Sequence, residues 1–150
     1  MAVEIRFYHL QRTTLETALP QLLEKVLGRN QRAVVMAGSS ERVEALNAHL
    51  WTYSERSFLP HGSARDGFPT EQPIWLTEQD ERPNAAQVLF LTDGATSARL
   101  EDYTMVVEMF DGNDEAAVIA ARTRWTGYKA QGHSLTYWRQ DDSGRWSEQG

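Results

Sequence analysis

The stretch from Tyr103 to Arg139 reads as a strand, a turn, a helix and a second strand, and the rest of the chain is organised around it. Its first part, Tyr103 to Phe110, is an apolar and partly β-branched run, as a buried central strand requires. Asp111-Gly112 ends that run with turn residues. His133 to Trp138 predicts the returning strand, with alternate side chains on opposite faces.

The segment between these two strands carries the signals of a helix. Asn113 or Asp114 can cap its N-terminus, alanines at positions 116, 117, 120 and 121 favour helix, and Gly132 ends it.

The charge of this helix is unusual for the chain. The net charge of the chain is −6, yet no Asp or Glu occurs from Ala116 to Arg139. The helix carries the basic and aromatic residues Arg122, Arg124, Trp125, Tyr128 and Lys129. Cations can pair with carboxylates or phosphates while rings bury an apolar group, so this surface suits a ligand that is both anionic and apolar. Alternatively, the cations complement the helix dipole and the rings pack inward.

Composition limits the number of domains and the classes of protein to which the chain can belong. A chain of 150 residues with 41% hydrophobic and 24% charged residues predicts one soluble domain over residues 1–150, with a frayed tail from 140 to 150. The absence of cysteine excludes disulfides, thiol catalysis and cysteine-ligated metals. No membrane span or signal pattern is evident, so we expect a cytoplasmic protein. Its acidity argues against broad contact with DNA.

The rest of the chain predicts further strands and helices in alternation. Thr13-Thr14-Leu15-Glu16 is typical of a capping box with Thr13 as the N-cap, and it opens a helix that Gly28 ends. Pro20 is expected to kink this helix or to mark the start of its regular part. A second helix is expected from Glu41 to about Trp51. Strands are expected over residues 3–9, 32–37, 73–77 and 87–92.

Gly38-Ser39-Ser40 lies between an expected strand and helix. Its backbone N–H groups could cradle a phosphate, or Ser39 or Ser40 could simply cap the helix. Neither main nucleotide-binding signature, GxGxxG or GxxxxGK[ST], is present where it would be needed.

The segment from residue 50 to residue 72 is rich in aromatic residues for a loop. Trp51, Tyr53, Phe58 and Phe68 offer more ring area than one face of a small domain buries, which predicts an exposed docking patch. The alternative is a strand over residues 58–61 that enters the core.

Catalytic chemistry has one candidate. Asp93 and Asp111 each precede a glycine at the end of an expected strand, where α/β folds bind ligands, and together they could hold Mg²⁺ for phosphate chemistry. Asp-Gly is also common turn chemistry. The four histidines lack metal-binding spacing, and the motifs GxSxG and SxxK are missing, so nothing demands an enzyme.

Several segments together resemble a known family. They are Leu50-Trp51, Ser57-Phe58-Leu59-Pro60-His61, Pro73-Ile74-Trp75, Val106 to Asp111, Ala121 to Lys129 and Gly132-His133. Their order and spacing resemble the chi subunit family of bacterial DNA polymerase III over nearly the whole chain. The resemblance implies a three-layer α/β/α sandwich of Rossmann type, with a mostly parallel sheet and no nucleotide-binding fingerprint.

The resemblance also implies a function. Chi subunits are non-catalytic accessory subunits of the clamp-loader complex that bind a psi-type subunit and the acidic C-terminal tail of the single-stranded-DNA-binding protein, without a cofactor. By position, the tail site implied here is Arg122, Arg124, Trp125, Tyr128 and Lys129, and the psi contact is Trp51, Phe58, Leu59 and Pro60. Thr126 stands where the family often has lysine. Direct binding of single-stranded DNA through the same helix is a further hypothesis, weakened by the acidic remainder of the chain.

Overall fold

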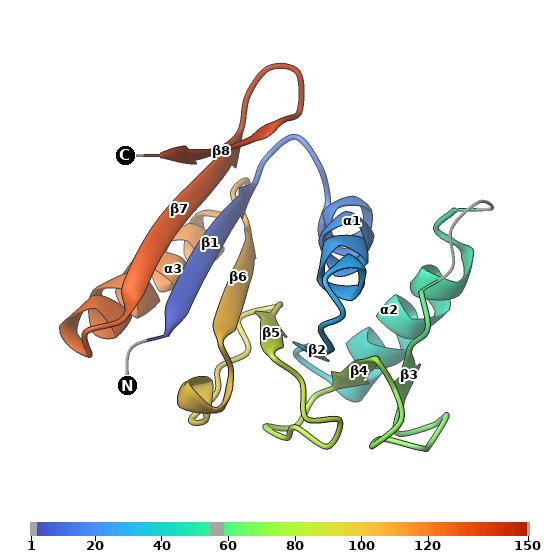
Figure 1. The fold of residues 1–150 in the computed structure, drawn as a ribbon. Helices are drawn as coiled ribbons and strands as arrows, with labels where there is room; N and C mark the ends of the chain where they lie inside the picture. The colour runs from blue at the N-terminus through green and yellow to red at the C-terminus, as the bar shows by residue number, and fades with distance from the viewer. Residues whose placement is uncertain (1–2, 55–58, 150) are drawn as a thin grey trace.

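The computed structural model describes residues 3–54 and 59–149, and in these residues eight strands form one sheet (Figure 1). The strand order is β3-β4-β2-β5-β6-β1-β7-β8. Neighbouring strands are parallel except for β7 and β8, which are antiparallel. The expected mostly parallel sheet is therefore confirmed.

Apart from β3 and β8, which were not predicted, the elements lie close to their predicted positions. The strands are β1 (Glu4–Leu10), β2 (Ala33–Met36), β3 (Gly62–Ser63), β4 (Ile74–Thr77), β5 (Val88–Leu91), β6 (Met105–Asp111), β7 (Ser134–Gln140) and β8 (Trp146–Gln149). The α-helices are α1 (Leu15–Gly28), α2 (Ser40–Thr52) and α3 (Glu115–Ala130), and Leu100–Asp102 forms a 3-10 turn. None of the helices in the described residues is long and apolar enough to cross a membrane.

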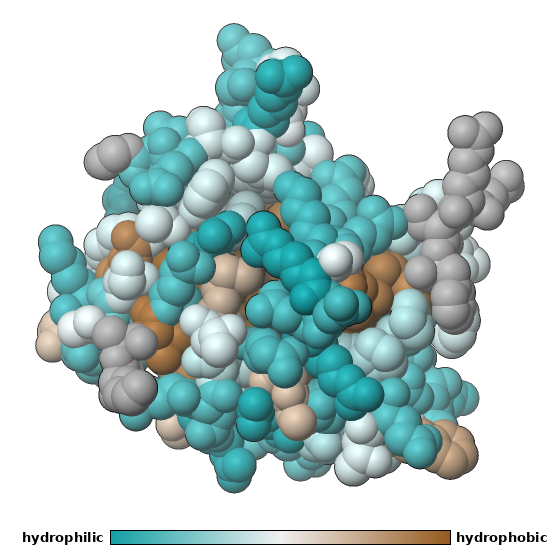
Figure 2. All heavy atoms as spheres, in the orientation of Figure 1, coloured by the Kyte–Doolittle hydropathy of each residue, from teal (hydrophilic) through white to brown (hydrophobic). Residues whose placement is uncertain are grey.

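The helices cover both faces of the sheet, which confirms the three-layer α/β/α sandwich. Figure 1 shows α3 behind β1 and β7, with α1 and α2 on the opposite side. One core cluster joins α1 and α2 to side chains such as Phe90 and Val107, and a second joins α3 to Ile5 and Val106. Since the central strands are buried on both faces, their sequences are nearly continuous apolar runs. On the face shown in Figure 2, hydrophobic residues come to the surface only in small areas.

Pro20 lies inside α1, and a residue of a second helix replaces the backbone hydrogen bond that the proline cannot make. A proline has no backbone N–H, so the carbonyl of Glu16 four residues earlier loses its partner in the helix. His49 of α2 supplies the missing donor, with its Nε2 2.6 Å from the Glu16 oxygen. The N-cap of α1 is Thr14, whose side chain accepts from the Thr17 amide, and not Thr13 as the sequence suggested. The hydroxyl of Thr13 donates instead to Gln140.

The start of α2 is capped by a side chain, as one of the two predictions for Gly38-Ser39-Ser40 had it. Ser39 is the N-cap, and its hydroxyl accepts from the Arg42 amide at 3.2 Å. The Gly38 amide donates to the Asp93 carboxylate. That amide therefore already has a hydrogen-bond acceptor within the chain and is not available to a phosphate.

The C-terminal tail is more ordered than predicted. In place of fraying, Trp146–Gln149 forms β8 and pairs with β7. The ring of Trp146 packs edge-on against Tyr8, with 4.9 Å between centroids. Burial of these rings stabilises a hairpin that its polar sequence did not suggest.

Candidate partner-binding site

Helix α3 packs on β6, β1 and β7 through a narrow apolar stripe. Ala121 and Tyr128 are buried against the sheet, while Val118 and Trp125 are half-buried beside them. Asp114 caps the helix by accepting from the amides of Ala116 and Ala117. These contacts determine which side chains of α3 remain at the surface.

A pocket of about 370 Å³ opens between α3 and the strands beneath it. Its lining combines four aromatic residues with small or aliphatic ones and a single cation: Phe7, Phe110, Val118, Ala121, Arg122, Trp125, Thr126 and Tyr137. The Trp125 ring meets Phe7 edge-on at 5.2 Å and Tyr137 at 6.1 Å. Among the described residues, no acidic side chain lines this pocket, so it suits an apolar group attached to an anion.

The exposed cations of the helix lie beside this pocket and near its end. Arg122 is exposed and contributes to the lining, and Lys129 is exposed in the last turn of α3. Among the described residues, neither side chain forms an ion pair. Both charges are therefore available to an external carboxylate.

Arg124 and Tyr128 point elsewhere, toward Glu108 of β6. Glu108 is only 1% exposed, accepts from Arg124 Nε at 3.1 and 3.2 Å, and accepts from the Tyr128 hydroxyl at 2.7 Å. Burial raises the pKa of Glu108, while Arg124 and Tyr128 act against that rise. Burial and the same carboxylate raise the pKa of Tyr128. These two residues are thus held on Glu108 and do not share the exposed surface of Arg122, although the family resemblance groups all three in one site.

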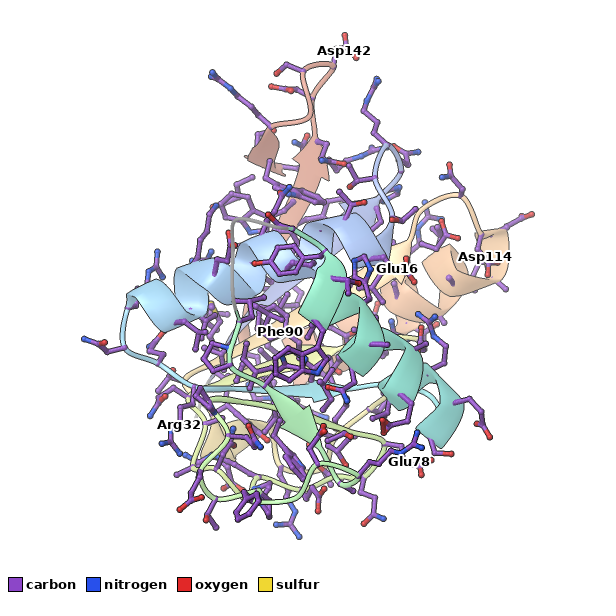
Figure 3. The ribbon with its side chains drawn as sticks, turned by 90° about the vertical axis from the view of Figure 1, so that its right-hand side faces the viewer. Glu16, Arg32, Glu78, Phe90, Asp114 and Asp142 are labelled. Atoms are coloured by element: carbon purple, nitrogen blue, oxygen red, sulfur yellow. The ribbon has the colours of Figure 1, made fainter. Side chains whose placement is uncertain are left out.

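The two candidate magnesium ligands line a wider cleft, of about 720 Å³, at the carboxyl ends of β1, β5 and β6. Asp93 is already bound by Arg42, whose Nε lies 3.0 Å from Oδ2, and Asp111 accepts from the Asn113 amide. Glu16 and Asp114 also line the cleft and lie at the same end of the molecule in Figure 3. Within the described ranges, no group of three or more metal-ligating side chains is found.

The aromatic segment after α2 divides between surface and core. Trp51 is 51% exposed, with its ring 4.4 Å from that of His61, and Phe68 is 69% exposed. Leu59 is buried and Pro60 half-buried, whereas Phe58 lies outside the described residues. Some side chains of this segment thus enter the core and others remain outside. The strand expected over residues 58–61 is not formed by the described residues 59–61, and the next strand is β3 at Gly62–Ser63.

Several pocket residues were not singled out from the sequence. Phe7, Phe110 and Tyr137 come from three strands far apart in the chain, and only the sheet order brings them together. Alternation along residues 133–138 correctly put Tyr137 on one face with Leu135, and both pack in the cluster that contains α3. Glu108 carried a stronger signal, because it is the one charged residue in the apolar run from Val106 to Phe110.

Comparisons with known proteins show which family the chain is similar to. The family model described as "DNA polymerase III chi subunit, HolC" matches residues 2–136. A protein from Rickettsia prowazekii (strain Madrid E), named "Probable DNA polymerase III subunit chi", is 35% identical over 106 residues. That alignment covers 69% of this chain and 64% of the relative's length.

Proposed function

This chain belongs to the DNA polymerase III chi subunit family, and from this premise we propose that it is a non-catalytic adaptor of the replicative polymerase. The adaptor binds the acidic C-terminal tail of the single-stranded-DNA-binding protein and so holds the clamp-loader assembly on coated single strands. The observation that supports this proposal best is the pocket between α3 and the sheet, which combines aromatic walls with Arg122 and lacks any acidic lining.

The chemistry of the pocket matches the chemistry of such a tail. An apolar C-terminal side chain fits between Trp125 and the aromatic rings of the strands, where it is removed from contact with water. The terminal carboxylate pairs with Arg122 through charge-assisted hydrogen bonds. Lys129, farther along the helix, attracts the acidic residues that precede the terminus. Arg124 and Tyr128 support binding indirectly, because they hold α3 on Glu108.

A titration with a labelled acidic peptide that ends in an apolar residue with a free carboxylate tests this proposal. Loss of a charge-assisted contact costs about 1.5–3 kcal/mol, so Arg122→Ala should weaken binding at least about tenfold at low salt. Arg65→Ala removes an equal charge from an exposed loop near β3 and should bind as wild type does. Equal affinities of wild type and Arg122→Ala at low and moderate salt would refute the assignment. A labelled oligothymidine in the same assay measures direct binding of single-stranded DNA.

The proposal includes a second contact, with a psi-type subunit, at the surface around Trp51, Phe58, Leu59 and Pro60. The exposed ring of Trp51 supports it, since Trp is enriched among the residues that dominate interfaces. Buried Leu59 serves mainly to anchor the segment in the core. Purification of the tagged chain from native lysate should recover such a partner with wild type and lose it with Trp51→Ala. Recovery by both proteins would exclude Trp51 from the contact.

A further inference from the structure

The pocket beside α3 has a second polar edge, on β7, that the helix residues do not account for. Tyr137 of β7 lines the pocket, and Arg139 follows two residues later on the same face of the strand. In the parallel pairing of β1 with β7, His9 stands opposite Arg139. Arg139 is held by a hydrogen bond to Gln11, with 3.0 Å between Nη2 and the amide oxygen.

His9 is buried behind Tyr137 and touches two walls of the pocket. Its Nδ1 is hydrogen-bonded to the Tyr137 hydroxyl, and its ring centroid lies 5.1 Å from Phe110 and 5.8 Å from Tyr137. Nε2 faces Gly112, where a Cβ would overlap the imidazole. Among the described residues this buried Nε2 has no hydrogen-bond partner.

These contacts determine the direction of the hydrogen bond between His9 and Tyr137. Burial, together with the charges of Arg139 and Arg122, lowers the pKa of His9, so the imidazole is neutral at pH 7 and has one N–H. A buried N–H without an acceptor is rarer than an unpaired acceptor, which puts the proton on Nδ1 and leaves Nε2 bare. Nδ1–H therefore donates to the oxygen of Tyr137. The hydroxyl proton of Tyr137 then points away from His9 and can be donated to a ligand.

We propose that Tyr137 and Arg139, positioned by His9 and Gln11, form with Arg122 the carboxylate-binding end of the pocket, an inference that rests on the proposed function. Arg122 lies on α3 and Arg139 on β7, and both charges act to lower the pKa of the Tyr137 hydroxyl, whereas burial, the larger effect, raises it. The second cation thus comes from the strand.

Paired peptides test this assignment: one acidic peptide with a free C-terminal carboxylate, and the same peptide amidated. Tyr137→Phe keeps the ring and removes the hydroxyl, and Arg139→Gln keeps most of the length and removes the charge. Each should bind the free carboxylate about tenfold more weakly, with little change for the amidated peptide. Arg65→Gln is the matched control, and its preference for the free carboxylate should equal that of wild type.

His9 is tested as a positioning residue by rescue. His9→Leu should lose the preference for the free carboxylate, whereas His9→Asn, which keeps an N–H donor near the position of Nδ1, should retain most of it. If Tyr137→Phe and Arg139→Gln both keep the wild-type preference, the proposed carboxylate end is wrong while tail binding stands. If wild type binds neither peptide, the proposed function and this inference fail together.

Discussion

Glu108 shows how one buried charge decides what its neighbours on α3 can do. It is the one charged residue within Val106 to Phe110 of β6, and its carboxylate accepts hydrogen bonds from both Arg124 and Tyr128. An ionised carboxylate in a buried position is stable only when it is paired and hydrogen-bonded. We therefore assign to Arg124 and Tyr128 the role of holding the helix, and to Arg122 and Trp125 the role of meeting the ligand.

Arg124→Ala should destabilise the protein at neutral pH. Removal of one partner of a buried pair costs about 3–5 kcal/mol, and because Arg124 keeps some exposure we expect a loss of about 3 kcal/mol in the free energy of unfolding. The loss should be smaller at about pH 5 than at about pH 7.5, because the pKa of Glu108 is raised. A group with a raised folded-state pKa contributes stability at low pH and loses it as the pH rises through that pKa. Urea denaturation at both pH values measures this difference.

Two variants control for the loss of charge itself. Arg122→Ala removes an exposed cation two residues away and should change the unfolding free energy by less than about 0.5 kcal/mol. Adding Glu108→Gln to Arg124→Ala removes the unpaired carboxylate and should recover part of the stability. An Arg124→Ala protein as stable as Arg122→Ala would show that the ion pair does not hold the helix.

The role of Glu108 could be predicted only in part from the sequence. A lone carboxylate within Val106 to Phe110 signals a buried polar contact, but its partners lie 16 and 20 residues away on a helix. Helical spacing states which side chains share a face, and it does not state how the helix is rotated on the sheet. That rotation depends on tertiary packing, so the sequence could not show that Arg124 and Tyr128 face Glu108.

At the scale of elements, α3 has one glycine in its interior and another just after its end, and the two have opposite consequences. Gly127 lies in the helix interior, and a Cβ there would meet no atom within 4 Å. Gly132 follows the helix with φ +87°, and its amide donates to Lys129 while that of His133 donates to Tyr128. This pair of bonds is the Schellman arrangement, which satisfies the last carbonyls of a helix and favours glycine.

The two glycines should therefore respond to alanine with opposite signs. Gly127→Ala should raise the free energy of unfolding by up to about 1 kcal/mol, because alanine has the higher helix propensity. Gly132→Ala should lower it by about 1–2 kcal/mol, because the left-handed conformation crowds a Cβ. Thermal unfolding by circular dichroism compares both with wild type. Equal shifts in the same direction would contradict the assigned end of the helix.

Elements with strong local signals were predictable, and short paired ones were not. Asp114, Ser39 and Gly132 mark helix ends through side-chain or backbone geometry that belongs to their own sequence. By contrast, β3 and β8 are strands because a neighbouring strand pairs with them. Gly62–Ser63 is too short to show an alternation of apolar and polar residues. The partial burial of Trp146 follows from its contact with Tyr8, which the sequence does not reveal.

At the scale of the whole molecule, the two faces of β1 and β7 serve different purposes. One face lies under α3 and contributes Phe7 and Tyr137 to the pocket. The other face carries Tyr8 stacked on Trp138 at 5.9 Å, with the Arg6 guanidinium 5.3 Å from the Trp138 ring. Trp146 of β8 completes this aromatic cover. The aromatic packing around Tyr8 and the proposed ligand pocket thus lie on opposite faces of the same sheet.

Trp146→Ala should accordingly weaken the fold without weakening the proposed tail contact. Complete truncation of a core Trp costs about 3–5 kcal/mol, and since Trp146 is half-buried we expect a loss of about 2 kcal/mol in the free energy of unfolding. Affinity for the acidic peptide, measured well below the unfolding midpoint, should stay within about twofold of wild type because Trp146 does not touch the pocket.

Trp125→Ala is the matched variant on the opposite face. It removes the same side chain from the wall of the pocket, so we expect it to weaken peptide binding by at least about tenfold. If Trp146→Ala loses affinity as Trp125→Ala does while still folded, the sheet transmits the disturbance from one face to the other. The hairpin of β7 and β8 would then contribute to binding. Helix α3 and β8 both contact β1 and β7, and a shift in β7 would move Tyr137 in the pocket wall.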